Sequence, residues 1–488
     1  MARSWQNLLL IGAVLLASHG VSAWHFAARY ASQTVRTSLA PLTLNLTPNQ
    51  WAAATAGADS SCYLLCAQQV AAGRGIALKT PNSDPPRLEP FVYWGPGCPW
   101  VLGQWQRLVG GATMWSFCAF AVVAQLIFGA LAVATAALWT RNTWALAATA
   151  LATGVCPPMQ DWFYGYALTS SEIVSLPIWA LIFYVLSKGF LAYRATALES
   201  TGRMRRWRVW PWFALAGVLI GIESLVRDSS EVFALFVAVF LVARALLLDR
   251  RQLVLVLSAA VLLVGATALV RRPVRGWNVR RIGVRVVSTS TEGSIWRFGL
   301  WVRHDMYDWY EQSGLGFGQY LDPDAPARVE QYYRDKLPSP ALYSLGQLLQ
   351  AIARHPSDAV AFKLSRLPVL WLGTDRWPNA RLSLTVWWCL AFYTLLAVYC
   401  VVRWRRKQPI PEVLYLYLLL LVAASPLIHF EFRYTFPVWN TLVIVPGLLI
   451  GAVAEARQAR RKLDNRTDAE RPTSGLGQDQ TVSPRSAA

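Results

Sequence analysis

Charged side chains are scarce in this sequence. Of its 488 residues, 15% are Asp, Glu, Lys or Arg, whereas 55% are apolar. Soluble globular proteins carry about 25% charged residues, so the composition argues against one large soluble domain. Acidic residues are fewer than basic ones: the sequence has 27 Asp and Glu and 46 Lys and Arg, which gives a formal net charge of +19. The basic residues gather at the ends of apolar runs, where they meet anionic lipid headgroups, so this charge does not predict nucleic-acid binding.

The sequence also lacks internal repeats, and cysteine is uncommon. No segment recurs with a period of about 20–50 residues and the two halves differ in hydropathy, which argues against a transporter built from inverted repeats. Of the seven cysteines, Cys62, Cys66 and Cys98 lie clearly outside the apolar runs. In an oxidising compartment Cys98 can bridge to either of the other two, or all three can stay unpaired. No His lies near Cys62 and Cys66, so they do not predict a metal site.

Ten apolar runs approach the length of about 20 residues that a helix needs to cross a hydrocarbon core. They span residues 7–24, 113–138, 143–155, 172–190, 209–226, 230–248, 252–270, 382–402, 413–429 and 436–454. The run at 143–155 is the shortest. We therefore expect an all-α polytopic membrane protein with about ten transmembrane helices and two large outer segments.

Basic residues alternate from one link between the runs to the next. The links that hold Arg203, Arg250 and Arg403 are rich in Lys and Arg, whereas residues 156–171 contain neither. Because short basic links stay inside, both termini are predicted to lie in the cytoplasm, with the helices in a bacterial inner membrane. The first run is not followed by a convincing signal-peptide cleavage site, so we expect it to be retained as an anchor.

The runs divide the chain into six predicted parts. These are an N-terminal anchor helix (1–24), a first periplasmic loop (25–111), transmembrane helices 2–7 (112–270), a periplasmic subdomain (271–379), transmembrane helices 8–10 (380–456) and a disordered, basic and polar cytoplasmic tail (457–488).

Ionisable residues gather where this topology places the outer ends of the helices. They are Asp59, Asp161, Glu172, Glu223, Arg227, Asp228, Glu231, His429, Glu431 and Arg433. Charges near the hydrocarbon core are costly, and acids beside Arg or His can activate a hydroxyl and hold an anionic leaving group. The alternative is a ring of solvated helix ends with local salt bridges, such as Arg227 with Glu223 or Glu231 at four-residue spacing.

The first outer segment carries a family resemblance. Asp59 opens "ADSSCYLLCAQQVAAGRGI", in which an apolar-periodic helix from Tyr63 to Val70 ends at Gly73 and Gly75, and a Pro-rich stretch follows up to "YWGPGCPW". This order resembles the first periplasmic loop of GT-C fold glycosyltransferases, in the branch of the protein O-mannosyltransferases and lipid A aminoarabinose transferases. "YALTSSEIVSLP", "GVLIGIESLVRDSSEVF" and "HFEFRYTFPVWNTLVI" are similar to later helices of that family.

The resemblance implies an enzyme that moves a sugar from a polyprenyl-phosphate donor to an acceptor hydroxyl, on a lipid or a protein, at the periplasmic side. Asp59 would be the general base. Many relatives have an acidic pair where this chain has Asp59-Ser60-Ser61, so Asp161 is our candidate for a second acid. A lone carboxylate there does not indicate a divalent cation, which stays an open alternative, and we expect no other cofactor.

The remaining polar residues at the outer face are our candidates for substrate binding. Arg433 is the first candidate for the lipid phosphate, because a guanidinium is permanently charged and can bind two phosphate oxygens. The other candidates for substrate binding are His429, Glu172, Arg227, Tyr63, Lys79, Arg280 and Arg297. Arg280 and Arg297 can equally face anionic membrane lipids, as expected of a basic outer domain.

Two other functions compete with this interpretation. A transporter or flippase of a lipid-linked substrate predicts charges deep within broken helices, whereas here they lie at one face beside long outer segments. An oligosaccharide ligase or polymerase fits large outer segments equally well. An Asp59 remote from any lipid-accessible cavity would favour either competing function.

The predicted orientation can be tested by labelling single cysteines in intact cells. A label beyond Arg461 should report the cytoplasm, and labels near Asp84 or Ala325 should report the outer side. A C-terminus that an impermeant reagent reaches from outside would contradict the ten-helix topology and move every candidate residue to the wrong face.

Overall fold

The computed structural model describes the helices and a part of the links between them. The described residues are 2–36, 58–79, 88–90, 95–111, 114–156, 170–198, 208–227, 230–248, 250–282, 287, 353, 356–373, 383–425 and 432–469.

Each of the ten apolar runs forms a helix over most of its described residues. Helices long and apolar enough to cross a membrane are α1 (Ala2–Arg36), α5 (Met114–Ala137), α8 (Ser171–Leu198), α10 (Glu231–Leu248), α11 (Leu253–Ile282), α17 (Leu384–Arg405) and the continuous pair α19 (Phe436–Leu442) and α20 (Val445–Ala469). The shorter ones are α6 (Thr143–Gly154), α9 (Trp210–Val226) and α18 (Val413–Ala424). The all-α polytopic fold is thereby confirmed.

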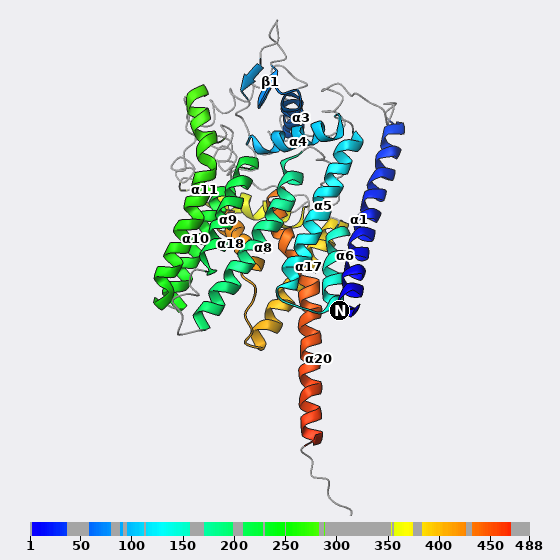
Figure 1. Cartoon of the computed structure of the whole chain (residues 1–488), viewed down its shortest axis with the longest axis vertical. Coiled ribbons are helices and arrows are strands. Elements are labelled where there is room, and N and C mark those ends of the chain that lie inside the picture. The colour runs from blue at the N-terminus through cyan, green and yellow to red at the C-terminus, as the bar shows by residue number, and fades with distance from the viewer. Residues whose placement is uncertain are drawn as a thin grey trace, which may run out of the picture.

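The two ends of the helical bundle differ (Figure 1). The N-terminus of α1 and the projecting half of α20 point the same way, while α3 (Ala58–Ala71), α4 (Gly97–Val109) and β1 (Ala77–Lys79) lie at the opposite end. β1 pairs with β2 (Leu88–Pro90) as a short antiparallel ribbon with Leu78 opposite Glu89. We call the end that carries α3 and α4 the outer end, after the predicted orientation.

Two apolar cores, each a contiguous cluster of buried side chains, hold the bundle together. One joins α3 and α4 to α5, to the first turns of α8, and to α17–α20. The other joins the rest of α8 to α9, α10 and α11. Between α9 and α11 the Thr267 hydroxyl donates to the Gly217 carbonyl at 2.9 Å, the close small-residue contact that helices in lipid favour.

Several helices run past the boundaries expected from the apolar runs. α1 continues to Arg36 and α11 continues to Ile282. α20 continues to Ala469, so the first part of the tail predicted to be disordered is helical. The helix continues here because the sequence is rich in arginine, at positions 457, 460 and 461. Arginine is a good helix former, and outside the membrane its charge can face water.

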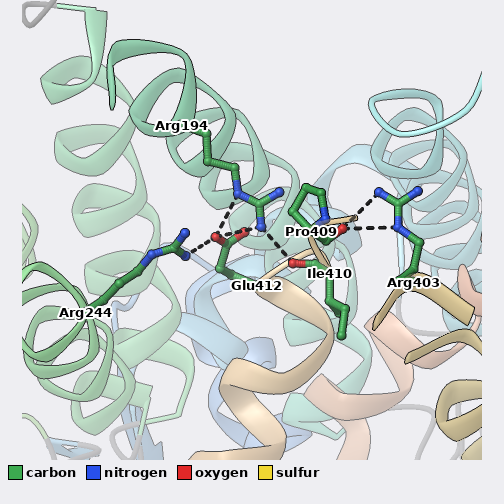
Figure 2. A network of polar contacts seen from close by, with 6 residues as sticks. All are labelled: Arg194, Arg244, Arg403, Pro409, Ile410 and Glu412. Carbon is green, nitrogen blue, oxygen red and sulfur yellow. Dashed lines mark hydrogen bonds and ion pairs between the residues drawn. The ribbon is translucent and has the colours of Figure 1, made fainter. Parts of the chain in front are cut away.

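The inner end is tied together by one buried acid (Figure 2). Glu412, whose side chain is fully buried, pairs with Arg194 of α8 at 2.9 Å and with Arg244 of α10. Arg194 also donates to the Ile410 carbonyl at 2.8 Å, and its guanidinium lies 5.3 Å from the Trp139 ring centroid. A carboxylate at the start of α18 thus fixes the inner ends of α8 and α10.

Removing this carboxylate should destabilise the bundle. Glu412→Gln keeps the side-chain shape but leaves two partly buried guanidinium groups without a counter-ion, which we expect to lower the free energy of unfolding by about 3 kcal/mol. SDS-driven unfolding of the detergent-solubilised protein measures this. Glu455→Gln, the same change at an exposed position of α20, is the control; equal effects of both variants would contradict the buried tie.

Candidate functional site

The first outer segment sits directly on the outer ends of the membrane helices. α3 packs closely on α4. At Gly103 of α4 there is no room for a side chain, since a Cβ there would lie 2.6 Å from the Cβ of Val70. The turn before α4 in turn packs on the end of α9: a Cβ at Gly95 would lie 2.9 Å from the carbonyl carbon of Leu225. Gly95, the first glycine of "YWGPGCPW", is therefore needed where this backbone meets α9.

An ion pair lies beside this contact. Glu172 stands in the first turn of α8, and Arg227 follows the last turn of α9, where its backbone N–H donates to the Glu223 carbonyl at 2.7 Å. The Arg227 Nη1 lies 2.9 Å from the Glu172 Oε1, and the two side chains are 17% and 1% exposed. The Ser171 hydroxyl donates to the other Glu172 oxygen at 3.4 Å. The pair thus joins two helix ends rather than residues four apart on one helix.

Arg227 also reaches the segment before the last span. Its guanidinium carbon lies 5.8 Å from the ring centroid of Tyr434, a cation–π contact. Tyr434 belongs to the short 3-10 helix η5 (Phe432–Thr435), which also contains Arg433. The backbone of Arg433 is therefore next to the residue that Arg227 contacts.

These groups line one small pocket, whose empty volume of about 380 Å³ includes open solvent and whose enclosed part has room for about one water molecule. The lining residues are Glu172, Ser175, Leu176 and Trp179 of α8, Arg227 and Ser230, Tyr417 of α18, and Tyr434, Phe436, Pro437 and Asn440 of η5 and α19. Four of them are aromatic. The pocket thus combines ring faces, an acid, a guanidinium and an amide.

Glu223 lies behind the pocket wall. Its side chain, in the last turns of α9, is fully buried, with Ser175 and Trp179 of α8 beside the carboxyl group. These two side chains are its hydrogen-bonding neighbours, at a geometry looser than that of an ordinary hydrogen bond.

A second ion cluster lies nearby at the same end. Glu231, in the first turn of α10, pairs with Arg271 and, at 3.3 Å, with Arg275 of α11. Arg271 is 3% exposed. The cluster fixes the outer part of α11 against α10 and does not line the pocket.

The structure brings together some of the residues predicted from the sequence. Glu172 and Arg227 form the ion pair, as members of the pocket. Tyr63 is 4% exposed and lies in the core between α3, α4 and the membrane helices, a packing position rather than a lining one. Arg280 is exposed near the end of α11 and is not among the lining residues.

The other predicted residues lie partly or wholly outside the described residues. Asp59 stands in the first turn of α3, Lys79 ends β1 and Arg433 lies in η5, and for these three the backbone alone is described. Asp161, His429 and Arg297 fall outside the described residues altogether. Their roles stay predictions.

Sequence reasoning missed the aromatic and amide members of the pocket. Trp179 and Tyr417 lie on apolar helices, where an aromatic side chain is ordinarily a core residue, and their rings meet at 5.0 Å between centroids. Asn440, 4% exposed within an apolar run, was the one available signal, because a buried amide inside a membrane helix requires a partner.

Cys98 lies at the start of α4, close to the same acids. Cys98 and Cys66 both carry free thiols, so no bridge joins these two; the side chain of Cys62 lies outside the described residues. Burial, with the nearby Glu172, raises the pKa of this thiol well above its usual range, so Cys98 stays protonated and is not a nucleophile. No cluster of His, Cys, Asp or Glu among the described residues could hold a metal ion.

No family model and no curated protein matches the sequence. Among solved structures, the chain resembles the archaeal oligosaccharyltransferase AglB from Archaeoglobus fulgidus in complex with an inhibitory peptide and a dolichol-phosphate, with 14% identity and a TM-score of 0.50 over 95% of this chain and 52% of that one. The same enzyme tethered to an acceptor peptide gives 15% identity and a TM-score of 0.48 over 95% and 51%.

The chain spans about half the length of these proteins, and so low an identity shows a shared fold alone. That fold is of the GT-C type. The described membrane helices therefore share this fold.

The contact of the Gly95 turn with α9 can be tested by adding one methyl group. Gly95→Ala places a Cβ against the backbone of Leu225, which should push α4 off α9 and cost about 1–3 kcal/mol of stability. Gly111→Ala is the control, because a Cβ there meets nothing within 4 Å. Proteolysis of the first outer segment in the purified protein reports the displacement; equal protection in both variants would contradict the contact.

Proposed function

We propose that this protein is a membrane glycosyltransferase that moves a sugar from a polyprenyl-phosphate donor to an acceptor hydroxyl, on a lipid or a protein, at the outer face of a bacterial inner membrane. One observation carries the proposal. A pocket with an acid and a guanidinium lies at the outer end of a GT-C-type bundle, the same end as α3, whose first turn contains Asp59.

The reaction determines which groups are needed. The sugar is already activated by its phosphate, so the enzyme has to position the acceptor oxygen opposite that bond, remove the hydroxyl proton and stabilise the departing phosphate. Asp59 is our candidate for the proton acceptor, since a positioned carboxylate contributes about 100- to 10,000-fold. Asp161 is the candidate for a second acid.

Arg433 is our candidate for the lipid phosphate. It lies in η5 beside Tyr434, whose ring contacts Arg227, so its backbone is at the pocket and at the outer end of the last membrane span. A lipid phosphate reaches this depth without leaving the bilayer surface. His429, Lys79, Arg280 and Arg297 are secondary candidates for the same anion.

Glu172 and Arg227 shape the site. Their ion pair fixes the outer end of α8 to that of α9, and the contact of Arg227 with Tyr434 extends the tie to η5. The Arg227 guanidinium, held between α8, α9 and η5, keeps one orientation during the reaction, which preorganised catalysis requires.

The solved neighbour agrees with this assignment in outline. Its structure holds a dolichol-phosphate, which is a polyprenyl-type lipid phosphate, together with an inhibitory peptide. That protein therefore binds a lipid phosphate and a peptide on a GT-C fold, and we propose the same classes of donor and acceptor for this chain, with lipids as alternative acceptors.

A transporter remains the competing function. Alternating access would require the inner ends of the helices to separate, and with them the ion pairs by which Glu412 ties α8 and α10 to α18. An oligosaccharide ligase would share the outer pocket and differ in its donor, so it is tested by supplying the donor directly.

Asp59→Asn tests the general base. The variant keeps size and hydrogen bonding but cannot accept the proton, so sugar transfer should fall by about 100-fold or more. Ser61→Ala, in the same helix, is the control and should retain activity. Near-normal turnover by purified, folded Asp59→Asn would remove Asp59 from this role.

Arg433 is tested by comparing donor binding with stability. Arg433→Lys keeps the charge and loses the planar two-point contact, so donor affinity should fall, and Arg433→Ala should bind more weakly still. Glu431→Ala distinguishes the competing explanation, a salt bridge, because then both alanine variants would lose similar stability with donor affinity intact. Unchanged donor affinity in Arg433→Ala would exclude Arg433 from the site.

A further inference from the structure

α4 lies across the outer end of the bundle, crosswise to the membrane helices (Figure 1). Residues 110–113 separate it from α5, a helix long and apolar enough to cross the membrane. The Trp105 indole N–H donates to the Ser116 carbonyl at 2.7 Å, and the Trp105 and Phe120 ring centroids are 5.4 Å apart. The last turns of α4 are therefore fixed against the first turns of a membrane span, which places them near the bilayer surface.

The side of α5 that Trp105 contacts is the side that faces lipid. Phe120, Val123 and Ile127 follow one another at three- and four-residue spacing, so they share one face of the helix. Val123 and Ile127 are 41% and 47% exposed, as expected of side chains that meet lipid along a membrane span. The Trp105 ring thus lies at the outer end of a lipid-facing surface.

An apolar stripe on α4 continues this surface. Val101, Trp105 and Leu108 recur at four- and three-residue spacing and follow one side of the helix; we call them the α4 stripe. Leu108 is 78% exposed, and Trp100 in the first turn is 52% exposed. The opposite side of α4 is buried. An exposed apolar stripe on a helix that runs along a bilayer is typical of an interfacial helix, and tryptophan is enriched at membrane–water interfaces.

Two arginines lie on the other side of α4 from its contact with α5, where α3 packs. Gly103, which contacts α3, and Arg107 are four residues apart and so share a side of α4. The Arg107 Nε donates to the Ala71 carbonyl at 3.0 Å, and the Arg74 Nε donates to the Gln69 Oε1 at 2.6 Å. Both arginines are exposed. Because α3 lies on the outer side of α4 (Figure 1), these cations lie above the stripe, where lipid phosphates are expected.

We infer that α4 is an interfacial helix whose partner is the bilayer itself. The α4 stripe lies in the lipid of the leaflet at the outer end, with Trp100, Arg74 and Arg107 at the level of the headgroups. Since α3 packs on α4, the helix whose first turn contains Asp59 is thereby held at a fixed height over the same leaflet. The inference concerns the attachment of the first outer segment to the membrane and does not depend on the reaction proposed above.

A photoreactive amino acid at single positions identifies what contacts the stripe. p-Benzoylphenylalanine replaces Leu108 in one variant of the full-length protein, and the 78% exposure of Leu108 leaves room for the larger ring. Native membranes are irradiated before purification, so that the benzophenone group bonds to a C–H group beside it. Mass spectrometry of the peptide that carries position 108 then distinguishes a lipid adduct from a peptide adduct.

Two further variants serve as controls. The same replacement at Val123 lies on the lipid-facing side of α5 and sets the yield expected in lipid. The replacement at Ala72 is equally exposed but lies in the turn after α3, on the outer side of α4. By this account position 72 faces water.

We expect phospholipid adducts at position 108 at least about 5-fold more often than at position 72, as for a side chain in lipid compared with one in water, and at a yield close to that at position 123. Adducts of position 108 to a peptide, from this chain or another protein, would show that protein covers the stripe and would overturn the inference. Equal lipid yields at positions 108 and 72 would overturn it as well.

Discussion

The ion pair between Glu172 and Arg227 is the interaction on which the outer end of this protein depends. It joins the start of α8 to the end of α9 at 2.9 Å, and through Tyr434 it reaches the segment before the last span. Each of the three segments arrives from a different part of the chain. The pair therefore places the pocket, and with it the link that contains Arg433, at one fixed depth.

The two ends of the bundle use buried charge differently. At the inner end one acid is enclosed by two guanidinium groups, and Arg194 and Arg244 both pair with the same oxygen of Glu412, which holds the helices together. At the outer end the ion pair of Glu172 and Arg227 lines an open pocket instead.

The fold followed from the sequence because membrane helices are encoded locally. Apolar runs such as 172–190 must be helical to satisfy their backbone in lipid, and the helix after Asp59 was visible in its apolar spacing. The partners of buried charges were not predictable, since Arg227 pairs with Glu172 across 55 positions and Glu412 with Arg194 across 218. The positions of the helices could be derived from the apolar runs. The pairs of helices that pack against each other could not.

The most direct test of a polyprenyl-phosphate-dependent transferase is mass spectrometry of glycolipids and glycoproteins from a deletion strain and its parent. The account predicts that one glycosylated product disappears while sugar-bearing polyprenyl phosphate accumulates, and that wild-type protein, but not Asp59→Asn, restores the product. An identical set of glycosylated lipids and proteins in the deletion strain and its parent would contradict the account.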